Sequence, residues 1–458
     1  MDPVREQFAR GQRRAAVWES AGNRVFDRAT VSRRKTVSPD REAPSKVLLV
    51  RGARQLLTLR GGSGPRRGEQ MRALGVIPDG ALLIVDGVIR EVGPSRRVEM
   101  LAAAREAEEL DASGRVVMPG FADCQTHLLA PPAPLDDYET RCLQGRYPEP
   151  LLPGGWTAFE AAKIMRGYSA QRLELEGKRQ LRSMWRHGTL ALGSTSGAGL
   201  DEASELRALR VLESLNDRPV RIVPSFGGGL GLAPEFDGRA ADYLEWVREE
   251  ILPLLAKRKL AGRVDVALAG AAFSRADVEG YAAAARRAGL GIAVRLRGPV
   301  SWLPEGTLSV SGVRHLERGA ARLADNGTVA VFTPGAHFHS GEAEPEPARE
   351  FIAAGAAVAV STAFHPRESP TPSMPMAIAL ACAQLRMTPA EAITAATING
   401  ACALGIGAHT GSLEAGKTAD LLVMNAADYR EIPMHFGINP VMMALRRGQV
   451  IFPRLEPA

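Results

Sequence analysis

The stretch GRVVMPGFADCQTHLL, residues 114–129, joins an unbroken apolar run to a polar end. Such a run, followed by polar side chains, is typical of a buried strand whose carboxyl end opens onto a site. From this stretch to about residue 405, short apolar strands alternate with longer amphipathic segments. Strands that alternate with helices predict βαβ units and a parallel sheet.

Eight strands are predicted in this part of the chain, at 116–123, 189–194, 221–225, 264–268, 291–295, 308–313, 329–333 and 357–362. Eight βα units over about 290 residues predict a closed (β/α)8 barrel of the TIM type, an α/β fold, over residues 116–405. A doubly wound open sheet is the alternative.

Short strands flank the predicted barrel on both sides. Residues 46–115 contain apolar runs around an Asp86-Gly87 turn, which predicts a hairpin, and residues 406–458 return to short strands. We expect these two segments to form one discontinuous β-sandwich domain. Residues 1–45 hold ten Lys and Arg against six Asp and Glu. This basic segment is predicted to be a disordered, solvated tail rather than a nucleic-acid-binding arm, because no aromatic residues interleave its charges in a binding pattern.

The composition is that of a folded globular protein. The chain has 458 residues, of which 45% are hydrophobic and 24% charged, with a formal net charge of +6. No run approaches the roughly 18 apolar residues of a membrane span, and the first residues lack the apolar core of a secretory signal. Four cysteines without C-x-x-C spacing favour neither a disulfide framework nor a zinc knuckle. We therefore expect a cytoplasmic protein.

Several segments resemble one family of enzymes. They are residues 53–89, 114–128 and 361–405, the GSLEAGKTADLLV segment at 411–423, and DYREIPMHFGIN at 428–439. Together they are similar to the imidazolonepropionases of the amidohydrolase superfamily. The resemblance implies a barrel beside a small β-sandwich, a homodimer, and hydrolysis of a cyclic amide C–N bond in histidine degradation with a bound zinc or iron ion.

The resemblance also implies four metal ligands, and this sequence departs from three of them. The His-x-His pair that ends the first strand reads Gln125-Thr126-His127, the histidine of the fifth strand is replaced by Arg295, and the aspartate of the eighth strand by Ala363. Only His127 remains at a ligand position. A catalytic zinc usually needs three protein ligands, so we expect no metal at this place. The sixth-strand histidine, a catalytic group in the family, corresponds to His315.

The remaining histidines leave a relocated metal site open. His337 and His339 follow the seventh strand and His365 follows the eighth, so these three and His127 are candidates for a divalent-metal site at the barrel mouth. The alternative is that His337 and His339 are loop residues beside the acidic run at 342–346.

Two arginines at the end of the fifth strand are candidates for substrate binding. Arg295 and Arg297 lie on one face of an extended strand, where guanidinium groups suit an anionic ligand. The interpretation we favour is an internal salt bridge, with Asp123 on the first strand as the candidate partner.

Two functions follow from these patterns. The first is a noncatalytic imidazolonepropionase-like protein that acts by binding a small molecule or by association. The second is a hydrolase of C–N bonds in a small cyclic amide, built on a remodelled histidine centre. Neither function calls for a membrane or nucleic-acid partner.

Overall fold

The computed structural model describes residues 46–132, 135–144, 158–197, 199–269, 273–324, 326–342 and 344–452. The predicted basic tail at 1–45 lies outside these ranges. Within them, no helix combines the length and the apolar character that a bilayer crossing requires.

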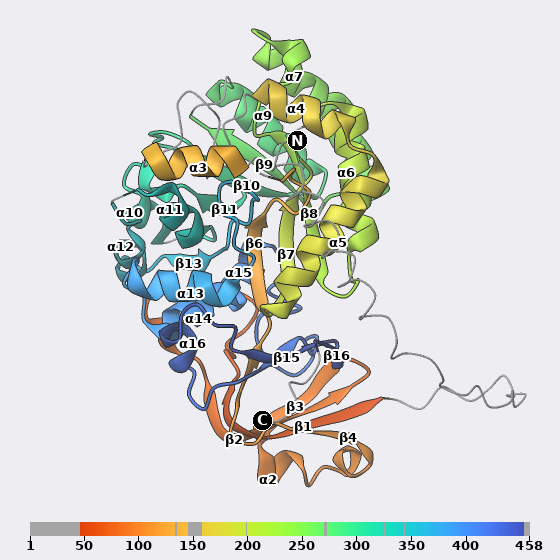
Figure 1. The fold of residues 1–458 in the computed structure, drawn as a ribbon, viewed down its shortest axis with the longest axis vertical. Coiled ribbons are helices and arrows are strands. Elements are labelled where there is room, and N and C mark those ends of the chain that lie inside the picture. The colour runs from red at the N-terminus through yellow and green to blue at the C-terminus, as the bar shows by residue number, and fades with distance from the viewer. Residues whose placement is uncertain are drawn as a thin grey trace, which may run out of the picture. The chain divides into compact units, whose positions relative to one another are not determined.

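A parallel eight-stranded barrel dominates the described part of the chain (Figure 1). Its strands follow the chain order, and each pairs in parallel with the next. They are β6 (Phe121–Thr126), β7 (Thr189–Thr195), β8 (Arg221–Gly229), β9 (Arg263–Leu268), β10 (Gly291–Leu296), β11 (Thr307–Ser311), β12 (Val329–Phe332) and β13 (Ala357–Val360). The predicted barrel is confirmed, and the open doubly wound sheet is not what the chain forms.

Side chains join the first and last strands of the barrel. The buried carboxylate of Asp123 on β6 accepts hydrogen bonds from the hydroxyl groups of Ser361 and Thr362, which follow β13, and from the Thr362 N–H at 3.2 Å. The His127 N–H also donates to the Phe364 carbonyl at 2.7 Å. These bonds close the barrel where the strand ladder ends.

Helices surround the barrel, and most of them are amphipathic, with an apolar stripe that packs against the strands. Ser169 caps α5 and Asp201 caps α6, each accepting a hydrogen bond from the third residue along. The helices in this layer are α3 (Leu135–Gln144), α4 (Ala158–Gly167), α5 (Ala170–Arg186), α6 (Glu202–Leu215), α7 (Ala240–Trp246), α8 (Leu252–Arg258), α9 (Arg275–Arg287), α10 (Gly319–Ala324), α11 (Pro334–Ser340), α12 (Ala348–Ala353), α13 (Met374–Ala383) and α14 (Pro389–Ala396), with 3-10 turns at Pro234–Phe236 and Val313–His315 and a π turn at Val247–Ile251.

Helix α15 (Ile398–Ala403) closes the N-terminal end of the barrel, where it contacts β6 and β13. Arg263, the first residue of β9, is fully buried there and donates from Nη2 to the Cys124 carbonyl at 2.8 Å. The opposite end, where the strands finish, is free to form a site.

A second eight-stranded sheet is built from both flanking segments. Its strands are β1 (Val47–Leu57), β2 (Val76–Val85), β3 (Val88–Pro94), β4 (Glu108–Asp111), β5 (Val116–Pro119), β14 (Leu421–Met424), β15 (Val441–Arg446) and β16 (Gln449–Phe452), with short helical turns at Gly68–Arg72, α2 (Ser95–Val98), Ala102–Glu106 and α16 (Glu431–Met434). The predicted hairpin is present: β2 and β3 pair antiparallel, and Asp86 and Gly87 both have positive φ between them.

The strand predicted at 116–123 is wrong as a single element, because Gly120 divides it. Residues of β5 pair with β14 in the second sheet, and the barrel strand β6 begins only at Phe121. A Cβ at Gly120 would lie 2.4 Å from the Leu190 side chain, so the chain turns between the two sheets at the one residue that fits. The barrel therefore begins five residues later than predicted.

Candidate functional site

Arg295 lies at the centre of the polar network at the barrel mouth. From the end of β10, its Nη1 lies 2.6 Å from Nε2 of His127, and its Nη2 donates to the hydroxyl of Thr195 at 2.8 Å. The same Nη2 forms an ion pair with Asp265 on β9 at 3.0 Å. The Thr195 hydroxyl also donates to Asp265, at 2.6 Å. One guanidinium thus joins side chains from the first, second and fourth barrel strands.

His127 takes part in this network as a neutral imidazole. Burial and the positive charge of Arg295 hold the pKa of His127 well below its usual value. A neutral imidazole has one unprotonated ring nitrogen that accepts a hydrogen bond, and here Nε2 takes that role because the Arg295 guanidinium can only donate. The lone pair that a metal ion would take is therefore already used.

The four positions where the family resemblance implies metal ligands do not fit a metal ion in this structure. A guanidinium lies within hydrogen-bond distance of the one retained imidazole, and its positive charge would repel a cation. Ala363 has no donor atom, yet its φ is +49°, a left-handed conformation that aspartate adopts more readily than alanine. The backbone of a ligand turn remains, but its ligand does not.

The predicted internal salt bridge of Arg295 is present, but its predicted partner is wrong. Asp123 is occupied in the seam between β6 and β13, where burial raises its pKa to about 6. Asp265 pairs with Arg295 instead, because neighbouring strands place Arg295 opposite Ala267, two residues from Asp265 on the same face of β9. The Arg297 N–H donates to the Leu268 carbonyl at 3.0 Å, but its guanidinium makes no hydrogen bond or ion pair with any residue of the described ranges.

The four histidines of the predicted relocated metal site have different partners. His365 packs edge-on against His127, with ring centroids 5.2 Å apart. His339 stacks on Tyr138 of α3, and its Nε2 lies 3.0 Å from the Arg367 carbonyl. His337 Nδ1 lies 3.1 Å from an Arg314 guanidinium nitrogen and 3.5 Å from Glu342. Across the described residues, no three His, Cys, Asp or Glu side chains are grouped so that they could hold a metal ion.

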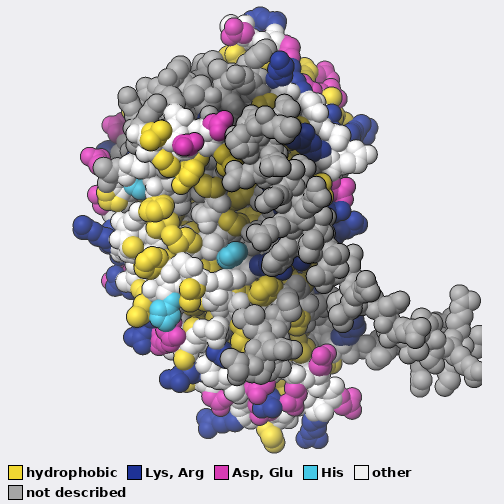
Figure 2. All heavy atoms as spheres, viewed as in Figure 1, with side chains coloured by type: hydrophobic (Ala, Val, Ile, Leu, Met, Phe, Trp, Pro, Cys, Tyr) yellow, Lys and Arg dark blue, Asp and Glu magenta, His cyan; other side chains and the backbone are white. Residues whose placement is uncertain are grey.

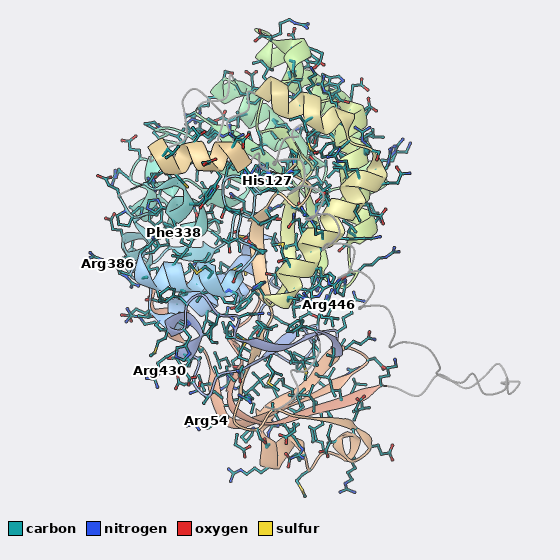
Figure 3. All side chains as sticks on the ribbon, viewed as in Figure 1. Arg54, His127, Phe338, Arg386, Arg430 and Arg446 are labelled. Atoms are coloured by element: carbon teal, nitrogen blue, oxygen red, sulfur yellow. The ribbon has the colours of Figure 1, made fainter. Side chains whose placement is uncertain are left out.

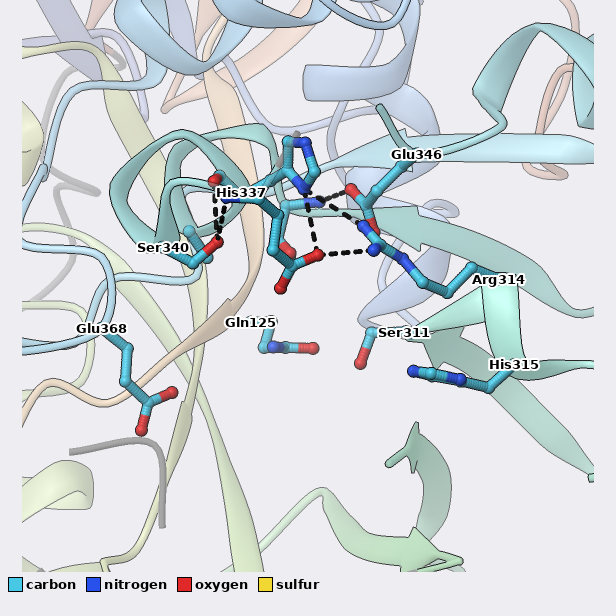
Figure 4. A pocket seen from close by; sticks show the side chains of 12 residues that line it. Gln125, Ser311, Arg314, His315, His337, Ser340, Glu346 and Glu368 are labelled. Carbon is cyan, nitrogen blue, oxygen red and sulfur yellow. Dashed lines mark hydrogen bonds and ion pairs between the residues drawn. The ribbon is translucent and has the colours of Figure 1, made fainter. Parts of the chain in front are cut away.

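A pocket of about 400 Å³ opens beside this network (Figure 4). It lies at the ends of β6, β11 and β12 and against α11, the edge of the barrel where sites form in this fold. Its lining consists of Gln125, Ser311, Gly312, Arg314, His315, Thr333, Ala336, His337, Ser340, Glu342, Glu346 and Glu368. His315 occupies the position for which the family resemblance implies a catalytic histidine, and Figure 4 shows its ring directed into the pocket.

The wall beside α11 carries an ion-paired group and a buried carboxyl group. Arg314 pairs with Glu342 at 2.5 Å and approaches His337, and burial together with Arg314 lowers the pKa of His337. Glu346 is 7% exposed and accepts the Thr333 N–H at 3.1 Å, and burial raises its pKa to about 7. Burial thus shifts the pKa values of both His337 and Glu346 toward the uncharged form.

Sequence reasoning missed Asp265, Thr195 and Glu346. An acid inside the apolar strand sequence RVDVAL was a usable signal for Asp265, since a buried carboxylate needs a partner. Glu346 gave no such signal, because it lies in an acidic run that reads as solvated surface.

Comparison with known proteins first defines the class. A solved structure, the guanine deaminase of E. coli, matches 90% of this chain and all of its own with a TM-score of 0.62 at 17% identity, which shows the shared barrel fold. The amidohydrolase family model matches residues 308–451. The chain thus has the fold and a matching segment of an amidohydrolase.

Curated relatives narrow the class to one family. The imidazolonepropionase of Solibacter usitatus is 37% identical over 88% of this chain and 97% of its own length. That of Chloroflexus aggregans is also 37% identical, over 88% of this chain and 98% of its own. The chain belongs to the imidazolonepropionase family of amidohydrolases.

Proposed function

We propose that this chain is a noncatalytic member of the imidazolonepropionase family that acts by binding a small molecule in the barrel-mouth pocket. One observation carries the proposal: the Arg295 guanidinium donates to His127 and pairs with Asp265 where the family would hold its metal ion. Metal-dependent hydrolysis needs an ion to activate water and polarise the carbonyl. The network supplies no place for that ion.

The residues at the mouth can still bind and orient a ligand. Gln125, Ser311 and His315 present an amide, a hydroxyl and an imidazole to the pocket. A concave site with a few convergent polar groups is the usual form of a small-molecule site. The alternative, a hydrolase with a remodelled histidine centre, is weakened because His337 is engaged by Arg314 and Glu342.

The first test is turnover of imidazolonepropionate by the purified protein, with and without added zinc or iron. We expect no enzymatic turnover in either condition, and less than about a tenth of an equivalent of bound metal. Turnover at the rate of an enzyme would overturn the proposal. Turnover of another small cyclic amide would favour the alternative.

A second test restores the family ligands. The variant Gln125→His, Arg295→His, Ala363→Asp provides four ligand side chains together with His127, and we expect it to bind about one equivalent of zinc. Its matched control keeps the guanidinium and carries only Gln125→His and Ala363→Asp. Zinc binding by this control would show that Arg295 does not exclude the ion.

We also propose that the protein acts in the cytoplasm as a homodimer. Large apolar side chains are exposed on one face: Leu135 and Leu143 on α3 are 80% and 83% exposed, and Phe338 on α11 is 58% exposed. Figure 2 shows hydrophobic side chains gathered over these helices. Exposed apolar patches mark interaction surfaces. Analytical ultracentrifugation checks the dimer, and a monomer at micromolar concentration would contradict it.

A further inference from the structure

Three polar side chains of the barrel-mouth pocket have no partner in the described part of the chain. The side chains of Gln125, Ser311 and His315 line the pocket and make no hydrogen bond to any described residue. In Figure 4 they lie on the same side of the hollow, below the wall formed by His337 and Arg314. Groups that are left unpaired in this way are free to bind a ligand that offers both donors and acceptors.

The charge of the pocket lining is negative. Its one arginine, Arg314, is already paired with Glu342, and His337 is kept neutral by burial and by that arginine. Glu346 lies in the buried wall, where its carboxylate accepts the Thr333 N–H. The Glu368 carboxylate, on the opposite side, makes no hydrogen bond or ion pair within the described ranges. Neither the Glu346 nor the Glu368 carboxylate forms an ion pair with a described residue, although Arg314 lies near Glu346 and Arg297 near Glu368.

The neighbouring arginines form no ion pair with these two carboxylates. Arg295 is paired with Asp265, whose side chain is 1% exposed. Arg297 does not line the pocket, and its positive charge offsets part of the charge of Glu368 but not that of Glu346. A cationic group placed against Glu346 would lie in a medium of lower dielectric constant, where the attraction is stronger than at the surface.

We propose that the pocket binds a small organic cation, a protonated amine on a polar body, with its ammonium group against Glu346. The body of the ligand then meets Gln125, Ser311 and His315, and Glu368 adds to the negative field from the other side. A pocket of about 400 Å³ suits a ligand of this size. This inference deepens the proposed function and rests on its claim that the mouth serves for binding.

Two probes of similar shape and opposite charge test the proposal. Histamine and 4-imidazolepropionate share an imidazole ring and a two-carbon chain, but one chain ends in an ammonium and the other in a carboxylate. Isothermal titration calorimetry of the full-length protein at pH 8 and low salt compares their Kd values. We expect histamine to bind at least about tenfold more tightly.

Single variants locate the charge. Glu346→Gln removes it from the buried wall and should weaken histamine binding about tenfold while leaving 4-imidazolepropionate unchanged or bound more tightly. Glu368→Gln, on the more exposed side, should weaken histamine less and serves as a second variant if the first does not fold. The matched control is Glu250→Gln, at an exposed glutamate outside the pocket.

Three results would overturn the proposal: equal or tighter binding of the anion, no effect of Glu346→Gln beyond that of Glu250→Gln, or no binding of either probe at millimolar concentration. Each leaves the noncatalytic assignment standing, because that assignment depends on turnover and metal content. Metal-dependent turnover, in contrast, would overturn the proposed function even if histamine were the preferred probe.

Discussion

Two buried arginine–aspartate pairs lie at opposite ends of the barrel, and they differ in what they hold together. Arg446 on β15 pairs with Asp420 at 2.7 Å and with Asp217, which precedes β8, at 2.6 Å. It thereby fastens the second sheet to the N-terminal end of the barrel. Arg295 pairs with Asp265 and contacts His127 at the mouth. Figure 3 shows Arg446 and His127 on these two sides of the barrel strands.

The two pairs differ in burial and in what surrounds them. The Arg446 side chain is 6% exposed and Asp420 is 3% exposed, and both join elements of the fold. Arg295 is 13% exposed, and its guanidinium lies at a position where the family resemblance implies a metal ligand. The same kind of ion pair thus joins two parts of the fold at one end of the barrel and lies within the polar network of the mouth at the other.

The largest effect is expected at the structural pair. Arg446→Ala leaves the buried Asp420 carboxylate without its guanidinium, which should lower the free energy of unfolding by about 3–5 kcal/mol. Urea denaturation measures the loss. The control is Arg430→Ala, whose solvent-exposed pair with Asp428 should contribute little to stability. Similar losses of unfolding free energy in both variants would show that the buried pair stabilises the protein no more than the surface pair.

A slightly smaller effect is expected at the mouth. Arg295→Met should lower the free energy of unfolding by about 2–4 kcal/mol, because Asp265 stays buried and keeps only Thr195 as a donor. Adding Asp265→Asn should restore most of this loss, since no unpaired charge remains. If the double variant is no more stable than Arg295→Met alone, the cost does not come from the stranded carboxylate.

The next effect is a dependence of stability on pH, and it comes from Glu346 in the pocket wall. The folded protein raises the pKa of Glu346 to about 7, so stability should fall as pH rises from about 4.5 through 7, while Glu346→Gln should lack this loss and gain about 1–2 kcal/mol at pH 8. Thermal melts across this pH range follow the difference. A wild-type melting temperature that does not fall over this range relative to the variant would contradict the prediction.

Glu391, a buried residue of α14, should change stability with pH in the opposite direction to Glu346. Arg349 and Arg72 and the N–H of Thr388 hold its pKa down, at about 2. Its contribution to stability is present above the pKa of the unfolded chain and is lost as pH falls toward 2, so Glu391→Gln should destabilise the protein at pH 8. A gain in stability at that pH would contradict this assignment.

The smallest effect is expected in the turn that follows Arg446, between β15 and β16. Arg447 and Gly448 both have positive φ in the turn between β15 and β16, a turn that favours Asn-Gly. Arg447→Asn should raise the free energy of unfolding by about 0.5 kcal/mol. A loss in urea denaturation would show that the 3.4 Å contact of Arg447 with Asp217 outweighs the relief of backbone strain.

Much of the fold could be predicted because its strands are local apolar runs. The strands predicted at 329–333 and 357–362 correspond to β12 and β13, whose residues are all buried. The first strand was placed wrongly, because an apolar run does not show that the chain leaves one sheet and enters the other at Gly120. The sequence also shows which ligand positions are lost, since Gln125, Arg295 and Ala363 can be read directly.

The partners at the site could not be read in the same way. Asp265 lies thirty residues before Arg295, and only the register of β9 against β10 brings them onto the same face of neighbouring strands. Of the histidines expected to converge at the mouth, His127 and His365 do meet. His337 and His339 do not join them, because α11 places His337 beside Arg314 and His339 against α3.

The sequence by itself determined the barrel, the second sheet and the loss of three ligand positions, because apolar periodicity and residue type are local properties. Only the tertiary structure decided that Arg295 donates to His127 and pairs with Asp265, and that Glu346 lies buried in the pocket wall. Hydrogen bonds and burial depend on which strands and helices meet, and the order of the residues does not give the distances across a closed barrel.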